Sequence, residues 1–316
     1  MEQQIGFCTT SDGAGIAYAT LGDGPPLVYV TGWPGHLAIE WERPFAREFL
    51  ESFAGEFTLV RYDMRNTGLS ERAGEDMSLE ALVRDLEAVV DKLRLDRFAL
   101  MSLGLLAGPV AITFAAAHSE RVSHMVALGP FLRGDRLLSE EQYKALRDYV
   151  AAFGQLVTPG DFRDPERHGL DQELVRQAAA IHDAGAPPQI QVRLLETLYR
   201  SDLTAALDRL DMPVLVLHGS GDGRVTLHAS REVAARLPNV QFVPYEGVGA
   251  APWADRDIIL PEIFQFLGAA PPQIATKAPR PAGGMATILF TDMESSTALT
   301  QRLGDAKAQE IVRAHD

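Results

Sequence analysis

Short apolar runs bounded by turn-forming residues recur along the chain and predict buried β-strands. The runs are Pro25–Gly32, Phe57–Asp63, Phe98–Met101, His124–Leu128, Met212–His218 and Val240–Tyr245. Helical patterns lie between them, with apolar residues spaced for one helix face from Ser78 onward and a second helix over Val110–Ala117. Strands that are apolar throughout and alternate with helices predict a mostly parallel sheet covered on both faces.

Residues of about 132 to 207 interrupt this alternation. They contain three helical stretches, SEEQYKALRDYVAAF, DQELVRQAAAI and QIQVRLLETLY, with no strand between them. A helical insertion between sheet strands usually covers the site at the carboxyl ends of the strands. The sequence therefore predicts a helical lid.

The segment from Phe98 to Ala117 contains 20 residues without a charge, which is long enough for a membrane helix. Gly104, Gly108 and Pro109 interrupt it, so we expect a buried strand, a tight turn and a buried helix instead. The formal net charge of −14 also disfavours anionic membranes and nucleic acids as partners.

A single cysteine, Cys8, excludes an intrachain disulfide and fits a reducing compartment. The N-terminus lacks a basic region followed by an apolar core, which is the pattern of a signal peptide. Together these features predict a cytoplasmic protein.

The amino-acid composition of the chain changes after residue 268. Residues 269–284 are rich in proline and glycine, which predicts an exposed, semi-rigid linker. Beyond it, residues 286–290 predict one strand and residues 297–303 one helix, too little to bury a core. We therefore expect domains at 1–268 and 285–316, the second cut short.

The first domain resembles the α/β-hydrolase fold. The matching segments are VYVTGWPGH, RYDMRNTGLS, the strand–turn–helix around residue 104 and VLVLHGSGD, in the family's order. Asn66 stands where the family pattern has a glycine, and asparagine is the next best residue for a left-handed backbone. The resemblance implies a mostly parallel sheet with a helical lid and no cofactor.

The catalytic triad that the resemblance implies is incomplete. Hydrolases of this fold carry a serine on the elbow, then an acid, then a histidine. The nucleophile position is Gly104 counted from the strand or Leu105 counted from the helix, and Ala250 stands at the histidine position. Asp222 retains the acid, although we expect it to cap a turn. These residues predict no esterase activity above background.

Two further interpretations concern the same region. Ser102, in the pattern x-x-S-x-G, is an alternative nucleophile, although no base is evident for it. We expect His36, His118, His218 and His228 to be structural or exposed.

A cleft without serine and histidine is less polar, so we expect Trp33, Leu105 and Ala250 to line a pocket for an apolar small molecule that is not turned over.

Residues 286–316 (ATILFTDMESSTALTQRLGDAKAQEIVRAHD) resemble the opening of class III adenylate and guanylate cyclase domains, an α+β fold. The resemblance implies metal binding by Asp292 and the Met293 backbone, and phosphate binding by Ser295, Ser296 and Thr297. A complete cyclase domain would require Mg or Mn and would bind ATP or GTP as a homodimer. The second metal-binding aspartate would lie beyond Asp316.

The two resemblances together predict a catalytically degenerate hydrolase domain that senses a ligand and regulates a class III cyclase. Two alternatives remain open at this point. The first is an active, esterase-like hydrolase that uses Ser102, and the second is a non-catalytic dimerisation scaffold.

Overall fold

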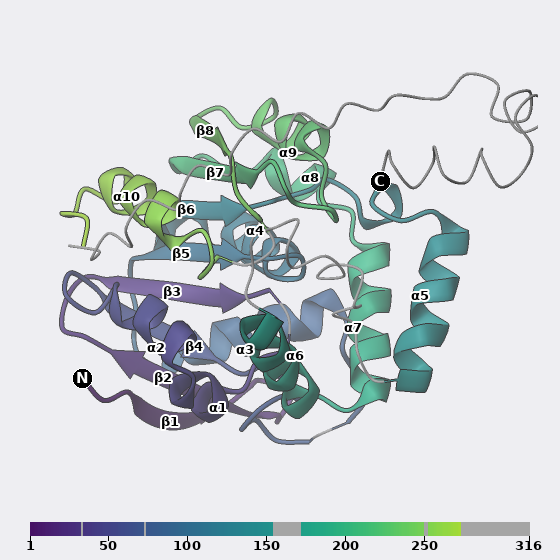
Figure 1. Cartoon of the computed structure of the whole chain (residues 1–316). Helices are drawn as coiled ribbons and strands as arrows, with labels where there is room; N and C mark the ends of the chain where they lie inside the picture. The colour runs from purple at the N-terminus through teal and green to yellow at the C-terminus, as the bar shows by residue number, and fades with distance from the viewer. Residues whose placement is uncertain (33, 73, 154–171, 250–251, 273–316) are drawn as a thin grey trace, which may run out of the picture. The chain divides into compact units, whose positions relative to one another are not determined.

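A single eight-stranded sheet forms the centre of the computed structural model, which describes residues 1–32, 34–72, 74–153, 172–249 and 252–272 (Figure 1). The strands are β1 (Gln4–Thr9), β2 (Gly15–Leu21), β3 (Pro26–Thr31), β4 (Thr58–Tyr62), β5 (Phe98–Leu103), β6 (Val122–Leu128), β7 (Val214–Gly219) and β8 (Val240–Tyr245). Their order in the sheet is β1-β2-β4-β3-β5-β6-β7-β8. The strands from β3 to β8 pair in parallel, whereas β1 and β2 add an antiparallel edge.

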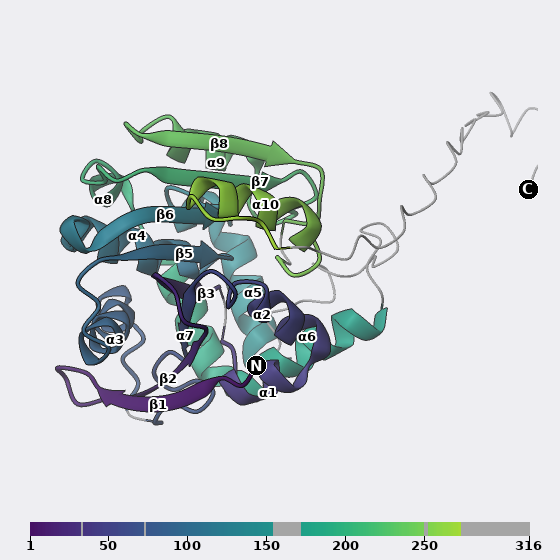
Figure 2. The same ribbon diagram turned by 90° about the vertical axis from the view of Figure 1, so that its left-hand side faces the viewer.

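Helices cover both faces of the sheet. The described helices are α1 (Leu37–Glu42), α2 (Pro44–Glu51), α3 (Leu79–Lys92), α4 (Ala107–Ala117), α5 (Glu140–Phe153), α6 (Gln172–Gly185), α7 (Pro188–Arg200), α8 (Thr204–Leu207), α9 (Leu227–Ala234) and α10 (Arg256–Phe266). One apolar core packs α3, α4 and α9 against one face, and a second packs α2 and α10 against the other (Figure 2). This arrangement confirms the predicted sheet covered on both faces.

The uncharged segment from Phe98 to Ala117 forms strand β5 and helix α4, as the sequence predicted. Helix α4 is apolar on every side because it lies in the core, where Val110, Ala111 and Phe114 are fully buried. In the part of the chain that the structure describes, no helix has the length and hydropathy needed to cross a bilayer.

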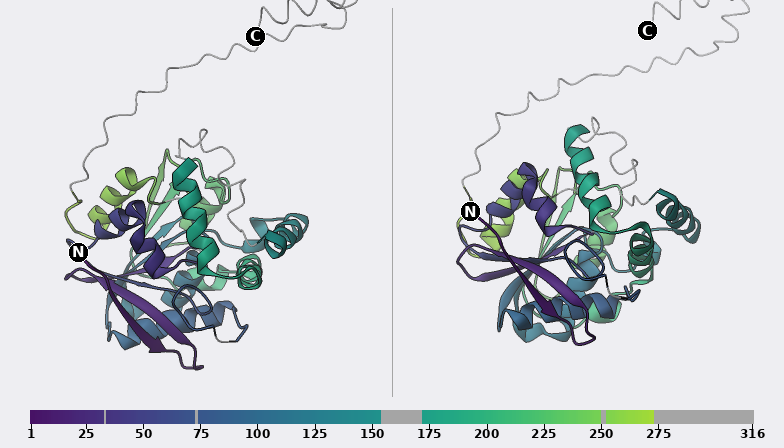
Figure 3. Two further views of the ribbon diagram at one scale, coloured as in Figure 1. Left: turned by 60° about the horizontal axis from the view of Figure 1, so that its bottom comes forward. Right: turned by 90° about the horizontal axis from the view of Figure 1, so that it is seen from below.

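The segment predicted as a lid contains the three helices α5, α6 and α7. The parallel strands point toward these helices in Figure 1, so the lid lies at the carboxyl ends of the strands. Helices α5 and α7 pack side by side, and the rings of Tyr143 and Tyr199 stack between them with centroids 4.1 Å apart. Figure 3 shows the lid helices at this end from two further directions, with β1 and β2 crossing the opposite side of the view.

The chain divides into two compact units, 1–274 and 275–316, and every described residue belongs to the first. The proposed cyclase residues Asp292, Met293, Ser295, Ser296 and Thr297 lie outside the described residues. The linker boundaries at 269 and 284 stay a prediction.

Candidate active site

The turn between β5 and α4 is the nucleophile elbow of this fold. Gly104 follows the last residue of β5 and has a φ of +112°, whereas α4 begins at Ala107. The nucleophile of such hydrolases occupies a sharp, strained turn of this kind. The positive φ is found at Gly104 and not at Leu105, which makes Gly104 the better candidate for the nucleophile position.

The backbone at the elbow lies very close to the end of β3. A Cβ atom at position 104 would lie 2.9 Å from the Cα of Gly32, and a Cβ at position 32 would lie 2.5 Å from the Cα of Gly104. Leu106 also donates its backbone N–H to the Gly32 carbonyl at 3.0 Å. Both positions therefore require glycine for the observed approach.

Ser102 lies inside strand β5 and away from the site. Its side chain is 1% exposed, and its Oγ donates to the Val126 carbonyl on the neighbouring strand β6 at 3.2 Å. It is not among the residues that line the cavity described below. A hydroxyl held between two strands has no path to a substrate, so the geometry opposes Ser102 as the nucleophile.

Asp222 occupies the loop after β7, where the family keeps its acid. Its Oδ1 accepts hydrogen bonds from the backbone N–H groups of Arg224 at 2.9 Å and Val225 at 3.2 Å. The loop after β8 passes beside it, because a Cβ at Gly249 would lie 2.8 Å from the Asp222 Cβ. Ala250, which follows, and Trp33 lie outside the described residues.

A cavity of about 420 Å³ opens beneath the lid and reaches the elbow. Gly104 and Leu105 form its floor. Its wall is mostly apolar and comes from α2, the lid and the loop before α10, through Phe45, Phe49, Leu50, Leu137, Leu138, Leu146, Ile181, Leu195, Leu198 and Trp253. Its volume falls within the ordinary range for small-molecule sites, about 300–1,000 Å³.

Among the described residues, the acidic and basic side chains that line this mostly apolar cavity are Glu40 of α1, His182 of α6 and Arg224 of the loop after β7. Glu40 is already paired, since its Oε2 lies 2.7 Å from Nη1 of the buried Arg61. Within the described part of the chain, no group of three or more His, Cys, Asp or Glu residues has the geometry of a metal site.

His182 is the functional candidate that sequence reasoning missed. Its Nδ1 lies 3.0 Å from the Pro34 carbonyl oxygen, which can only accept, so Nδ1 carries a proton. Burial lowers the pKa of His182, with the nearby Arg224 charge acting in the same direction. The ring is therefore neutral near pH 7 with Nε2 unprotonated, and His182 is one of the residues that line the cavity. The lid sequence AAAIHDAG gives no spacing that marks this residue.

The loop that carries Pro34 is held by a buried carboxylate in the RYDMRNTGLS turn. Asp63 accepts the backbone N–H of Leu37 at 3.2 Å and that of Leu69 at 2.7 Å. Burial raises the pKa of Asp63 to about 7. In the same turn Asn66 has a φ of +61°, which confirms the predicted left-handed backbone. Asp63 thus fixes the start of α1 and, through it, one side of the cavity.

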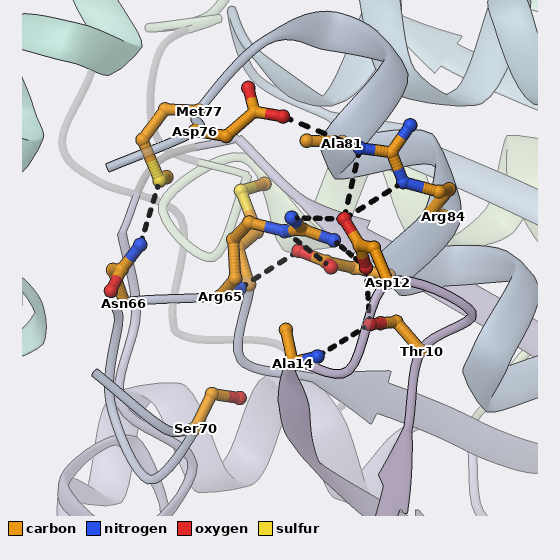
Figure 4. A network of polar contacts seen from close by, with 12 residues as sticks. Thr10, Asp12, Ala14, Arg65, Asn66, Ser70, Asp76, Met77, Ala81 and Arg84 are labelled. Carbon is orange, nitrogen blue, oxygen red and sulfur yellow. Dashed lines mark hydrogen bonds and ion pairs between the residues drawn. The ribbon is translucent and has the colours of Figure 1, made fainter. Parts of the chain in front are cut away.

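Arg65 of the same turn joins three segments of the chain in an ion-pair network (Figure 4). Its guanidinium donates to Asp85 of α3 at 2.8 Å and to Asp12 of the β1–β2 turn at 2.8 Å. Arg84 adds a second contact to Asp12 at 3.0 Å. Hydrogen bonds from Arg65 hold the pKa of Asp12 below its usual range, whereas burial raises the pKa of Asp85 to about 6. This network stabilises the sheet edge and does not reach the cavity.

The sequence profile of the α/β hydrolase fold family matches residues 25–253. The chain belongs to the α/β-hydrolase family. It is 27% identical over 251 residues to a pimeloyl-[acyl-carrier protein] methyl ester esterase of Nitrosomonas europaea, covering 76% of this chain and 94% of that one. It is also 27% identical over 280 residues to a non-heme chloroperoxidase of Streptomyces lividans, covering 83% and 99%. A thermophilic esterase of Thermogutta terrifontis superposes with a TM-score of 0.68 at 23% identity, covering 84% and 98%.

These comparisons correct the functional prediction from sequence. Membership of the class III cyclases is wrong, because the family found is the α/β hydrolases and the relatives are an esterase and a peroxidase. The prediction of a catalytically degenerate, regulatory hydrolase domain is also contradicted, since relatives that align over nearly their whole length are named as enzymes. They favour the alternative of an active hydrolase over both the regulatory module and the scaffold.

Proposed function

We propose that this α/β hydrolase cleaves small esters or lactones with an apolar body, and that it activates water directly instead of forming an acyl-serine. The observation that carries the proposal is that His182 lines the same lid-covered cavity as the elbow residues Gly104 and Leu105. A general base within reach of a bound carbonyl can do this chemistry without a protein nucleophile. The apolar wall suits a substrate with little polarity beyond its carbonyl group.

The reaction balances with His182 as the base. Nε2 takes one proton from water while the water oxygen bonds to the carbonyl carbon, and the C=O π pair moves to the carbonyl oxygen. The tetrahedral intermediate then collapses, the bond to the alcohol oxygen breaks, and that oxygen takes the proton back from Nε2. The products are an acid and an alcohol, or a hydroxy acid from a lactone, and His182 returns to its neutral form.

The developing oxyanion needs donors near the elbow. In this fold they are the backbone N–H of the residue after the nucleophile position and an N–H from the loop after β3. Leu105 is the first of these, and its N–H makes no backbone hydrogen bond within the described residues. Removing one such donor typically costs about 10²–10³ in kcat, so an elbow that keeps its shape keeps a large part of the catalytic power.

The experiment is hydrolysis of p-nitrophenyl butyrate and of a γ-lactone by the full chain. His182→Gln is expected to lower kcat by about 10²-fold or more, the usual contribution of a general base. The matched control is His228→Gln, which changes an exposed histidine at the start of α9. Because the pKa of His182 is lowered, kcat/KM is expected to reach half its maximum below about pH 6.5, the ordinary imidazole value.

Two results separate this mechanism from a serine mechanism. A fluorophosphonate that labels activated serines is expected to leave the activity intact, and Ser102→Ala is expected to retain the wild-type kcat. Inhibition by the fluorophosphonate that Ser102→Ala abolishes would instead establish the serine mechanism. Equal kcat in His182→Gln and wild type would remove His182 from the reaction, and no hydrolysis of either substrate class would overturn the proposed activity itself.

A further inference from the structure

Arg224 is the one cavity-lining cation among the described residues, and its guanidinium lacks a hydrogen-bond acceptor. Its Nε is buried and has no hydrogen-bond partner in the described part of the chain. The nearest carboxylate oxygen, Asp222 Oδ1, lies 3.7 Å from Nε, which is an ion-pair distance but too long for a hydrogen bond. A buried donor without an acceptor costs about 1–3 kcal/mol, and more when the group is charged, which a ligand could offset.

The other acids near the cavity are already engaged. Glu40 lies 2.7 Å from Arg61, whose second Nη donates to Gln3. Oδ1 of Asp222, the oxygen nearest to Arg224, already accepts two backbone N–H groups. The Nε–H of Arg224 therefore remains a donor without a hydrogen-bond acceptor among the described residues, and Asp222 offsets its positive charge only through an ion pair at 3.7 Å.

We propose that Arg224 binds a carboxylate carried by the substrate, so that the cavity selects apolar monoesters of dicarboxylic acids and the acids they release. The guanidinium is planar and can hold a carboxylate by two parallel hydrogen bonds. The substrate class rests on the proposed hydrolytic function, whereas binding of an apolar carboxylate does not depend on it.

The rest of the cavity accommodates the apolar part of such a molecule. Helix α2 contributes Phe45, Phe49 and Leu50 to its lining, and the lid contributes Leu138 and Leu146. An extended chain between these side chains would bury its methylene groups, each worth about 0.8 kcal/mol. The carboxylate end would then meet Arg224 in the loop beside the elbow.

Binding of a carboxylate at Arg224 is also expected to change the pKa of His182, which gives an independent measurement. The charged groups that influence the pKa of His182 are Glu40 of α1, Arg224 of the β7–α9 loop and Asp183 of its own helix, and Arg224 lowers it. Neutralising that guanidinium removes the repulsion between two cations. The pKa of His182 should therefore rise when the ligand binds, which histidine NMR signals can follow in the full chain.

The test compares monoethyl adipate with diethyl adipate, which differ in the charge at one end. The full chain is expected to show a kcat/KM about 10- to 100-fold higher for the monoester, the value of one charged hydrogen-bonded pair. Arg224→Gln is expected to abolish this preference. The matched control, Arg236→Gln, removes an exposed positive charge after α9 that pairs with Asp208 at 3.5 Å, and it should keep the preference.

A binding measurement keeps this proposal separate from the hydrolytic one. Calorimetric titration of the full chain with hexanoate and with hexanamide is expected to show tighter binding of hexanoate, lost in Arg224→Gln. If neither ester is cleaved but hexanoate still binds more tightly than hexanamide, the result supports the carboxylate site and contradicts the proposed hydrolysis. If both esters are cleaved equally and Arg224→Gln changes nothing, hydrolysis stands and the carboxylate site falls. Hexanoate binding that is unchanged in Arg224→Gln, or a His182 pKa that hexanoate leaves unmoved, also overturns it.

Discussion

At the scale of single residues, the elbow combines a positive φ with a close backbone approach. Gly104 holds a φ of +112°, and its missing Cβ leaves room for the Cα of Gly32. Residues other than glycine pay about 1–3 kcal/mol to hold such a backbone conformation. The backbone of the elbow is therefore unstrained in this chain, whereas a serine at position 104 would be strained.

Gly104→Ser is accordingly expected to lower the free energy of unfolding by about 1–3 kcal/mol. It should not create an acyl-enzyme, because Ala250 stands at the position of the family's triad histidine and no imidazole oriented by Asp222 can take the serine proton. Urea denaturation measures the first effect and a stopped-flow burst of nitrophenol the second. Gly55→Ser is the control, since a Cβ there meets no atom within 4 Å. A burst stoichiometric with enzyme would refute the argument.

The sequence identified the residues of the site that belong to a motif. Gly104, Asp222 and Asn66 were found because the family pattern fixes their place relative to strands. His182 was missed because it reaches the cavity only when the lid helix α6 packs over the sheet, and Arg224 because only the tertiary fold brings the β7–α9 loop to the same cavity. Their neighbours along the chain give no signal of that proximity.

At the scale of elements, the lid depends on packing between its own helices. Tyr143 of α5 and Tyr199 of α7 stack at 4.1 Å with an angle of 11° between their planes. Tyr199 also lines the cavity, whereas Tyr143 supports it from behind. An aromatic pair of this kind contributes about 0.5–1.5 kcal/mol beyond the area that it buries.

Tyr143→Ala is therefore expected to loosen the lid and raise KM several-fold, with a smaller effect on kcat, because Tyr199 loses its support while His182 and the elbow remain. Steady-state kinetics on p-nitrophenyl butyrate measures this change. Lys144→Ala, an exposed residue of the same helix, is the control and should leave KM unchanged. An unchanged KM in Tyr143→Ala would show that the stack does not shape the cavity.

The elements that the sequence predicted are those with a strong hydrophobic pattern. The six predicted strands and the three lid helices were found, because apolar runs and helical spacing indicate these elements. The expectation that all six strands are buried was wrong for β8, which lies at the sheet edge and is mostly exposed or half-buried. Strands β1 and β2 were missed. In β1 the apolar Ile5 and Phe7 are exposed at the sheet edge, so its pattern does not report a buried face.

At the scale of the whole molecule, two buried carboxylates make stability depend on pH. Burial raises the pKa of Asp63 to about 7 and that of Asp85 to about 6, from an ordinary value of 3.8. The folded chain therefore holds protons that the unfolded chain has released between about pH 4 and 7. This contribution to stability is complete below the unfolded pKa and is lost as the pH rises through the folded values.

The free energy of unfolding is thus expected to fall by on the order of 2 kcal/mol between about pH 5.5 and 8. Asp63→Asn keeps the size and one acceptor oxygen but cannot ionise, so it should flatten this slope. Urea denaturation at several pH values provides the measurement. Asp148→Asn, at an exposed carboxylate of α5, is the control. Asp85 should retain its own part of the slope in this variant, so only a slope as steep as that of the wild type would show that Asp63 stays ionised throughout.

The cyclase resemblance failed at this scale. It rested on about thirty residues after the linker, and a strand, a turn and a short helix recur in many proteins. The hydrolase resemblance combined four segments in a fixed order, and the family match extends from residue 25 to 253. Agreement between distant segments constrains a fold more strongly than a single contiguous motif.

The glycine contact between positions 32 and 104 also limits how this protein can change during evolution. A change to serine chemistry would require Ser at 104, His at 250 and a backbone shift at Gly32, where the new Cβ would lie 2.9 Å from the Cα. Each substitution made alone lowers the stability of the fold or adds no activity, so selection would not favour the intermediates between the two chemistries. Descendants of this chain are therefore expected to diversify through the lid and the cavity wall, while the elbow keeps its glycine.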